Sequence, residues 1–208
     1  IDYLIADPML TPPEQVAHYT EKIAYLPHTY QSNDAHRLIA DRQITRQEAG
    51  LPEQGFVFCC FNNNWKITPG VFDLWMRLLE RVEGSVLWLF EDNPSAGRNL
   101  QAEAVKRGIA AERLVFAPRM NLPEHLARHR LADLFLDTLP YNAHTTGSDA
   151  LWAGLPVLTC LGETFAGRVA ASLLKAVGLP ELITESAEAY EALALELATD
   201  PQKLAALR

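Results

Sequence analysis

The chain has 208 residues, of which 49% are hydrophobic and 21% are charged, and its formal net charge is -8. This length is enough for one roomy domain, or one domain and a piece of another, and the apolar fraction excludes a disordered chain. No apolar run reaches the roughly 20 residues of a membrane span. The acidic balance argues against a general nucleic-acid binder.

The three cysteines do not form a disulfide framework. Cys59, Cys60 and Cys160 all lie in apolar runs, where we expect reduced, buried, small side chains. No residues have metal-ligand spacing, and the chain suits a reducing cytoplasm.

The first residues predict a strand and then a helix. Residues 1–7 form an apolar run without the features of a signal peptide. Because nothing precedes this strand to pair with it, we expect the chain to be a fragment of a larger protein. The run Thr11-Pro12-Pro13-Glu14 is a helix-start signature and predicts a helix to about Tyr25. Residues 28–50 are polar and without a clear period, which predicts a linker or an extended surface segment.

From Gly55 onward, short apolar runs alternate with amphipathic stretches. The predicted strands are 56–61, 85–90, 114–117, 134–136, 156–160 and 182–183. The predicted helices are 70–81, 98–107, 123–128, 146–153, 167–177 and 188–198. Continuous apolar runs indicate strands buried on both faces, as in a parallel sheet. The order predicts a doubly wound α/β domain, whose ligands bind beyond the carboxyl ends of the strands.

The loop after the first of these strands carries Asn62, Asn63, Asn64, Trp65 and Lys66. Three amides and an ammonium group are costly in a core but useful at the carboxyl end of a strand, where they suit a polar ligand. A solvated turn is the alternative, since Asn is common in turns.

A second loop leads into a helix through His144, Thr145, Thr146 and Gly147. Backbone N–H groups and two hydroxyls at a helix N-terminus form an anion site, because the first-turn amides are unpaired and the dipole end is positive. Asp149 follows within reach of hydroxyls such as those of a ribose. Ordinary capping, with Thr145 as N-cap and Asp149 as a favourable first-turn acid, explains only part of this cluster.

A third loop precedes a short helix on which His125 and Arg128 share one face. The usual role of such a pair is a surface salt-bridge network. If they face the same cleft as Lys66 and Thr145, they could instead contact a diphosphate, for which Arg supplies bidentate contacts.

Several familiar motifs are missing. There is no Gly-x-Gly-x-x-Gly, P-loop or Gly-x-Ser-x-Gly elbow. Asp133 and Asp137 flank a strand, but no further carboxylate lies close by in sequence to complete a metal site. We expect the four tryptophans to be core or packing residues; they are Trp65, Trp75, Trp88 and Trp152.

These blocks resemble the C-terminal catalytic lobe of the O-GlcNAc transferase and SPINDLY family. The similar blocks are 62–66, 85–89, 131–138, 144–157 and 162–172, and residues 1–7 and 21–27 resemble the end of the family's N-terminal lobe. The resemblance is weakest over residues 30–54. It implies a Rossmann-like lobe of a GT-B glycosyltransferase. Residues 1–50 would then be the end of the N-terminal lobe plus a linker, and 51–208 the nucleotide-sugar-binding lobe.

The resemblance also implies roles for the phosphate-side residues. Lys66 would contact the donor diphosphate and stabilise the leaving group. Thr145 and Thr146, within the block from His144 to Gly147, would bind phosphate. Asp149 would hold the ribose.

On the base side, Met120 and Leu122 would lie against the uracil, with His125 and Arg128 beside it. Leu122 replaces a Lys that is common in the animal enzymes, and Asn63 replaces a usual Gln in the donor loop. The phosphate contacts therefore carry over more directly than base and sugar specificity.

The implied reaction is the inverting transfer of N-acetylglucosamine from UDP-GlcNAc to Ser or Thr hydroxyls of proteins. It would need no cofactor and no metal. The family's candidate base His belongs to the N-terminal lobe, outside this chain, and tetratricopeptide-type repeats would bind the acceptor proteins. Two alternatives stay open: a GDP-fucose donor, as in SPINDLY-type relatives, and a catalytically idle interaction scaffold.

Overall fold

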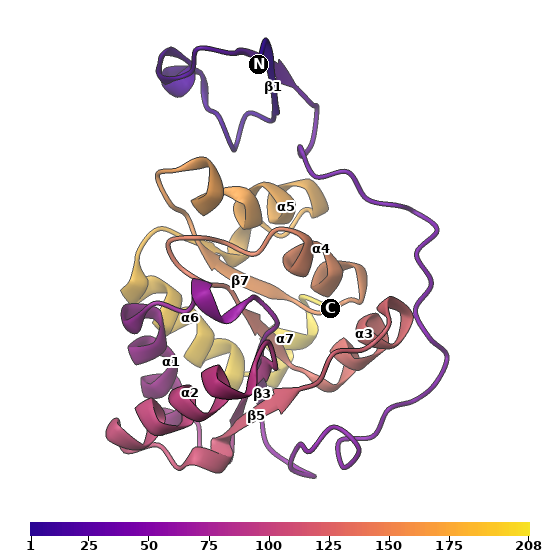
Figure 1. Ribbon diagram of the computed structural model, residues 1–208, viewed down its shortest axis with the longest axis vertical. Coiled ribbons are helices and arrows are strands. Elements are labelled where there is room, and N and C mark those ends of the chain that lie inside the picture. Colours follow the sequence, from indigo (N-terminus) through magenta and orange to yellow (C-terminus); the bar gives the residue numbers. More distant parts are fainter.

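The computed structural model describes residues 1–208, which form a two-stranded and a six-stranded sheet. In the small sheet, β1 (Tyr3–Ala6) and β2 (Lys22–Tyr25) are parallel and are joined through the 3₁₀ helix η1 (Pro13–His18). Figure 1 shows this pair at the top, away from the six-stranded sheet, with the chain then running down one side of the molecule.

The helix predicted from Thr11 to about Tyr25 is wrong beyond its start. Pro13 does begin a helical segment, but it is a 3₁₀ helix that ends at His18. The residues that follow form β2, in which Ile23 pairs with Leu4 of β1. A capping signature reports only on where a helix begins, whereas this pairing joins residues far apart in the sequence. The predicted first strand is confirmed, with its partner later in the chain.

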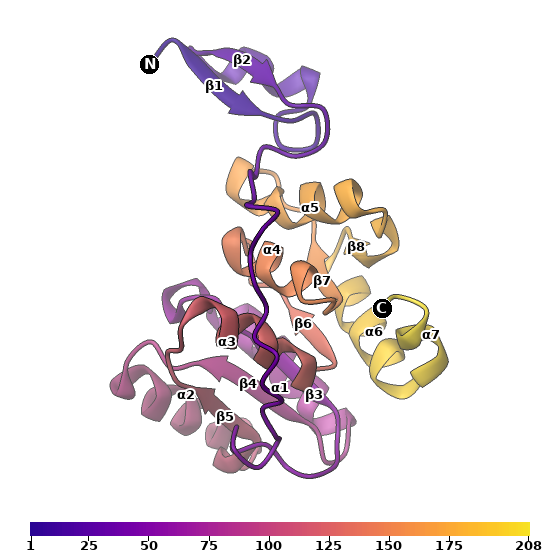
Figure 2. The same ribbon diagram turned by 90° about the vertical axis from the view of Figure 1, so that its right-hand side faces the viewer.

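Residues 28–50 contain no helix or strand, as expected for a linker or an extended surface segment. They follow an extended path over the surface of the larger domain (Figure 2). The assignment of residues 1–50 to the end of an N-terminal lobe stays a prediction.

The larger sheet is entirely parallel, in the order β5-β4-β3-β6-β7-β8. Its strands are β3 (Val57–Cys60), β4 (Val86–Phe90), β5 (Leu114–Ala117), β6 (Leu134–Leu136), β7 (Val157–Cys160) and β8 (Ile183–Thr184). Phe58 pairs with Leu87 on one side and Leu134 on the other, so β3 is central. Every predicted strand of this domain is confirmed, and β3, β6 and β7 are buried throughout.

All six predicted helices are present, with a short seventh at the end. They are α1 (Pro69–Arg81), α2 (Pro94–Lys106), α3 (Leu122–Arg128), α4 (Thr145–Trp152), α5 (Val169–Val177), α6 (Ala187–Thr199) and α7 (Pro201–Ala205). Helix α1 contacts α6, while α3 contacts α4 and α4 contacts α5. The order of strands reverses direction after β5, so right-handed crossovers put these two groups on opposite faces of the sheet. The predicted doubly wound α/β domain is confirmed.

The core confirms the cysteine prediction, because all three cysteines are free and buried. Trp75 and Trp88 are also buried, as predicted, but Trp65 is 61% exposed. No helix is both long enough and apolar enough to cross a membrane.

Candidate functional site

The candidate site lies where neighbouring strands β3 and β6 end, because their carboxyl ends meet at one edge of the sheet. Asn62 follows β3 and is buried there. Its Nδ2 donates to Thr138 Oγ1 at 2.7 Å, and its Oδ1 accepts a hydrogen bond from the hydroxyl of Thr146. One asparagine therefore joins the loop after β3, the loop after β6 and the start of α4, and it does not act as a solvated turn residue.

Asp137, at the end of β6, is fully buried and organises the second loop. Its carboxylate accepts from Thr138 N at 2.8 Å, Ala143 N at 2.5 Å and Thr159 Oγ1 at 2.7 Å, with Asn62 Nδ2 at 3.4 Å. Burial raises the pKa of Asp137 to about 6, and these hydrogen bonds partly offset that rise. The chain has no cluster of three His, Cys, Asp or Glu side chains arranged for a metal ion.

Lys66 supplies a cation at this edge. Its Nζ donates to the carbonyl of Asn142 at 2.8 Å and lies 4.1 Å from the ring centroid of Tyr141. Burial lowers the pKa of Lys66, and the nearby Asp137 carboxylate raises it. Lys66 forms no ion pair, since Asp137 is occupied by its own donors. The half-buried ammonium is thus held in place without an ion-pair partner.

The first turn of α4 supplies unpaired N–H groups beside this cation. Those of Thr145, Thr146 and Gly147 have no acceptor in the protein. Thr145 is the first helical residue and not the N-cap, so that part of the capping interpretation is wrong. His144 stands at the N-cap position and its side chain does not cap the helix. Gly147 keeps the turn close to its loop, because an added Cβ would lie 3.2 Å from that of Ala143.

An aromatic group borders Lys66. The Tyr141 ring stacks on His144 with centroids 5.1 Å apart, and Trp65 meets Tyr141 edge-on, also at 5.1 Å. The exposed Trp65 is therefore part of the wall of the site, not of the core. Burial, followed by the charge of Lys66, lowers the pKa of His144 and favours a neutral imidazole.

Helix α3 brings Arg128 to the same edge, and the predicted salt-bridge network is wrong for it. Arg128 is only 1% exposed and has no carboxylate partner. It lies 4.5 Å from the Phe61 ring and 5.9 Å from Trp88, and its Nη1 donates to Pro118 O at 2.6 Å. Its Nε and Nη2 have no partner. Burial lowers the pKa of Arg128 to about 10.

The remaining α3-side residues stand around this guanidinium. His125 lies 5.5 Å from Phe61 and 4.8 Å from His129, and burial, then Arg128, lowers its pKa to about 3. Met120 is partly buried, and Leu122 is 46% exposed at the start of α3. Asn63 is exposed in the loop after β3.

Asp149 has a partner that the sequence did not indicate. It is buried on α4 and forms an ion pair with Arg37 of the linker. Burial raises the pKa of Asp149, and Arg37 opposes that rise. The two residues are 112 positions apart, and no local motif marks Arg37.

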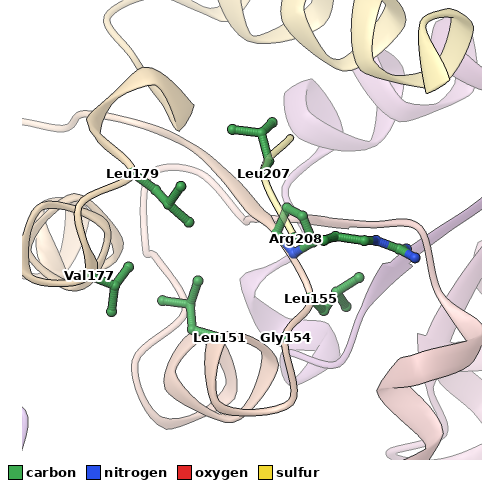
Figure 3. Close-up of a pocket in the computed structure, with 8 residues that line it drawn as sticks. Leu151, Gly154, Leu155, Val177, Leu179, Leu207 and Arg208 are labelled. Carbon is green, nitrogen blue, oxygen red and sulfur yellow. The ribbon is translucent and has the colours of Figure 1, made fainter. Parts of the chain in front are cut away.

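The predicted site residues thus lie beyond the carboxyl ends of three strands, β3, β5 and β6. A pocket of about 130 Å³ drawn in Figure 3 lies at the opposite end, since its lining residues Leu155 and Pro156 directly precede β7. It is lined mainly by apolar side chains, such as Leu179, and the chain's last residue, Arg208, also borders it. This pocket contains none of the predicted site residues.

Comparisons with known proteins identify the family of the chain. A profile described as Glycosyl transferase family 41 matches residues 41–208. The Arabidopsis thaliana protein named "Probable UDP-N-acetylglucosamine--peptide N-acetylglucosaminyltransferase SEC" is 38% identical over 213 residues, which cover 100% of this chain and 22% of that protein. A Caenorhabditis elegans UDP-N-acetylglucosamine--peptide N-acetylglucosaminyltransferase is 40% identical over 164 residues, 79% of this chain and 14% of that protein.

Among solved structures, a mutant O-GlcNAc transferase from Thermobaculum terrenum matches with a TM-score of 0.85 and 35% identity. The match covers 100% of this chain and 39% of that one. The predicted resemblance and the GT-B lobe are therefore confirmed. The chain spans only a minor part of each of these relatives.

Proposed function

The chain belongs to glycosyl transferase family 41, and on that premise we propose that it is the donor-binding half of a protein O-GlcNAc transferase. The donor is UDP-GlcNAc, and the acceptors are Ser or Thr hydroxyls of proteins. The transfer inverts the anomeric centre and needs no metal. The names of the relatives from Arabidopsis and C. elegans support this donor and a peptide acceptor.

The observation that carries the proposal is a cation without an ion-pair partner, Lys66, at the edge where β3 and β6 end. Lys66 has no carboxylate partner, although it is half-buried. The first-turn amides of α4 follow the loop whose Asn142 carbonyl accepts from Lys66, and they also lack acceptors. A fixed cation next to a helix N-terminus suits an anion such as a diphosphate.

The chemistry follows from where charge develops. As the bond between the sugar C1 and the phosphate oxygen breaks, the sugar becomes oxocarbenium-like and negative charge grows on the departing diphosphate. Lys66 and the amides of Thr145 and Thr146 are aimed at that charge and stabilise the transition state more than the ground state. The acceptor hydroxyl gives its proton to a base, which we assign to a His outside this chain.

The nucleoside takes the remaining positions. We place the uracil against Met120 and Leu122, with Arg128 and the neutral His125 beside it. Asp149 accepts from the ribose hydroxyls. The unpaired Nε and Nη2 of Arg128 support this placement, because a buried guanidinium without acceptors is ready to donate to a ligand.

The rest of the protein completes the enzyme on this proposal. We expect an N-terminal lobe to close the donor site from above, helical repeats to present acceptor proteins, and the whole to work in the cytoplasm. A nucleic acid or a membrane is not among the expected partners.

Calorimetric titration of the full-length protein with UDP and with GDP tests the donor. We expect tighter binding of UDP; tighter binding of GDP would replace the proposal by a GDP-sugar donor, such as GDP-fucose.

Lys66→Ala tests the enzyme against an idle scaffold. It should cost about 2–4 kcal/mol of transition-state stabilisation in a transfer assay. Lys175→Ala, which removes an exposed lysine of α5, is the matched control and should leave activity unchanged. Absence of transfer by the wild-type protein would favour the scaffold, and an unchanged transfer rate in Lys66→Ala would exclude the proposed role of Lys66.

A further inference from the structure

The linker is bound to helix α4 at three successive places. Each contact joins a linker side chain to a side chain of α4 or of its N-cap position, with Tyr30 Oη 3.1 Å from His144 Nδ1 and Ser148 Oγ donating to Asn33 Oδ1 at 2.6 Å. The third contact is the ion pair of Arg37 with Asp149. We call linker residues 29–37 the α4 strap.

Both ends of the α4 strap are tied down. At its start, Tyr30 N donates to the buried Asp7 carboxylate at 2.9 Å, and Ser172 of α5 donates to the same carboxylate at 2.7 Å. Just beyond its end, Ala40 N donates to the carbonyl of Pro123 in α3 at 3.0 Å. Figure 2 shows this path, with the linker passing α5, α4 and then α3. The strap therefore has a defined course across the helices that surround the donor site.

The Arg37–Asp149 pair is a buried contact of the strap. The exposed fractions of the two side chains are 10% and 7%. The guanidinium also lies 5.1 Å from the ring centroid of Trp152, which limits its rotation. Removing one partner of a buried ion pair leaves the other charge uncompensated, so the Asp149 carboxylate depends on Arg37.

We propose that Arg37 is a positioning residue for the nucleoside of the donor: by pairing with Asp149 it fixes the charge and orientation of the carboxylate that accepts from the ribose. This inference rests on the proposed function, in which Asp149 holds the ribose. Arg37 does not touch the reacting atoms and acts only through Asp149. The connection between the two sheets thus forms part of the donor site.

A ligand without ribose hydroxyls separates this role from simple bracing of α4. We would titrate the full-length protein with UDP and with 2′,3′-dideoxy-UDP by calorimetry. Arg37→Met should weaken UDP binding roughly tenfold to a hundredfold, and it should leave the weaker binding of dideoxy-UDP unchanged. Arg37→Lys, which keeps the charge, should restore part of the UDP affinity.

Arg42→Met is the matched control on the same linker. Arg42 is 57% exposed and pairs at the surface with Glu48 at 2.9 Å and with Glu124 of α3 at 3.6 Å. Exposed ion pairs contribute little, so its removal should not affect either ligand. An equal loss of UDP and dideoxy-UDP binding in Arg37→Met would overturn the inference. A loss of UDP affinity in Arg42→Met as large as that in Arg37→Met would also overturn the inference.

A double variant covers the case in which Arg37→Met folds poorly. In an Asp149→Asn background, replacing Arg37 by Lys should cost no further UDP affinity, because the carboxylate through which it acts is gone. Additive losses would overturn the inference. If UDP binding requires Lys66 and yet the Arg37 variants bind like wild type, only this inference fails. If wild type itself does not bind UDP, the proposed function fails, and this inference falls with it.

Discussion

Asp137 and Arg128 are both buried charged residues at one edge of the sheet, and they are held in opposite ways. The Asp137 carboxylate accepts hydrogen bonds from four groups of the protein. The Arg128 guanidinium has one carbonyl and the faces of two aromatic rings, and two of its nitrogens have no partner. A saturated buried charge shapes the loop around it, whereas an unsaturated one is available to a ligand. The two therefore predict opposite mutational effects.

The largest expected effect is on stability, from Asp137→Ala. The substitution leaves the amides of Thr138 and Ala143 and the hydroxyl of Thr159 without their acceptor in the core, so the free energy of unfolding should fall by about 3–5 kcal/mol. Urea unfolding measures this. Asp92→Ala, at an exposed position, is the control and should change stability by less than about 0.5 kcal/mol. A loss below about 1 kcal/mol for Asp137→Ala would contradict the structural role.

Arg128→Met should have the opposite pattern. Methionine fills a similar apolar space between the rings and removes a buried cation that lacks an ion pair, so stability should hold or rise. UDP affinity should fall by about 1.5–3 kcal/mol, the value of hydrogen bonds to a charged group. Urea unfolding and calorimetry together test this. Lost stability with unchanged UDP binding would show that Arg128 is structural, like Asp137.

His129, which packs against Phe61 and His125, gives a pH dependence of stability. It is 1% exposed, and burial lowers its pKa to about 4. Above pH 6.5 it is neutral in both folded and unfolded chains; below that, the unfolded chain takes up the proton first. Its contribution to stability is therefore present above about pH 6.5 and is lost as the pH falls toward 4, with a loss of about 2 kcal/mol between pH 7 and 5.

His129→Asn should remove that part of the pH dependence, measured as the free energy of unfolding at pH 7 and at pH 5. Asp137 acts with the opposite sign, because its pKa is raised to about 6, and it contributes equally to wild type and variant. An identical loss in both proteins on acidification would mean that His129 is not the group responsible.

The smallest expected effect concerns Asn62, which links the Asp137 loop to α4. Asn62→Ala should lower the free energy of unfolding by about 1–2 kcal/mol. A double-mutant cycle with Thr146→Val should give a coupling of about 1 kcal/mol, since the two side chains share a hydrogen bond. Additive effects would show that the hydrogen-bond network around Asp137 does not extend to α4.

The six-stranded sheet could be predicted from the sequence because strands that are buried on both faces consist of continuous apolar runs, such as Val57–Cys60. It failed for Lys22–Tyr25, where a strand of four residues follows a helix-start signature. The partner of that strand, β1, lies some twenty positions earlier. Pairing of this kind is decided by tertiary contacts, on which local propensity carries little information.

Within the site, the loops were found because a parallel sheet brings its ligands to one edge. The burial and the partners of each side chain were not predicted. The sequence pattern predicts that Arg128 lies on the surface of its helix, yet its guanidinium packs against the rings of Phe61 and Trp88. Trp65 is a large apolar residue of the kind expected in a core, yet its side chain is exposed to solvent. Both outcomes depend on which faces the neighbouring elements cover, and a single sequence does not encode that locally.

The α4 strap also has a consequence for recombination between relatives. A chimera joined near residue 50, where the compact domain begins, would combine one parent's strap with the other parent's α4 and break the match of Arg37 to Asp149. A junction before Asp7 would take the strap, the Asp7 carboxylate that anchors it and helix α4 from the same parent. If Asp149 and Arg37 act on the donor as proposed, exchanging donor preference between relatives requires a block that begins before the strap and not at residue 50.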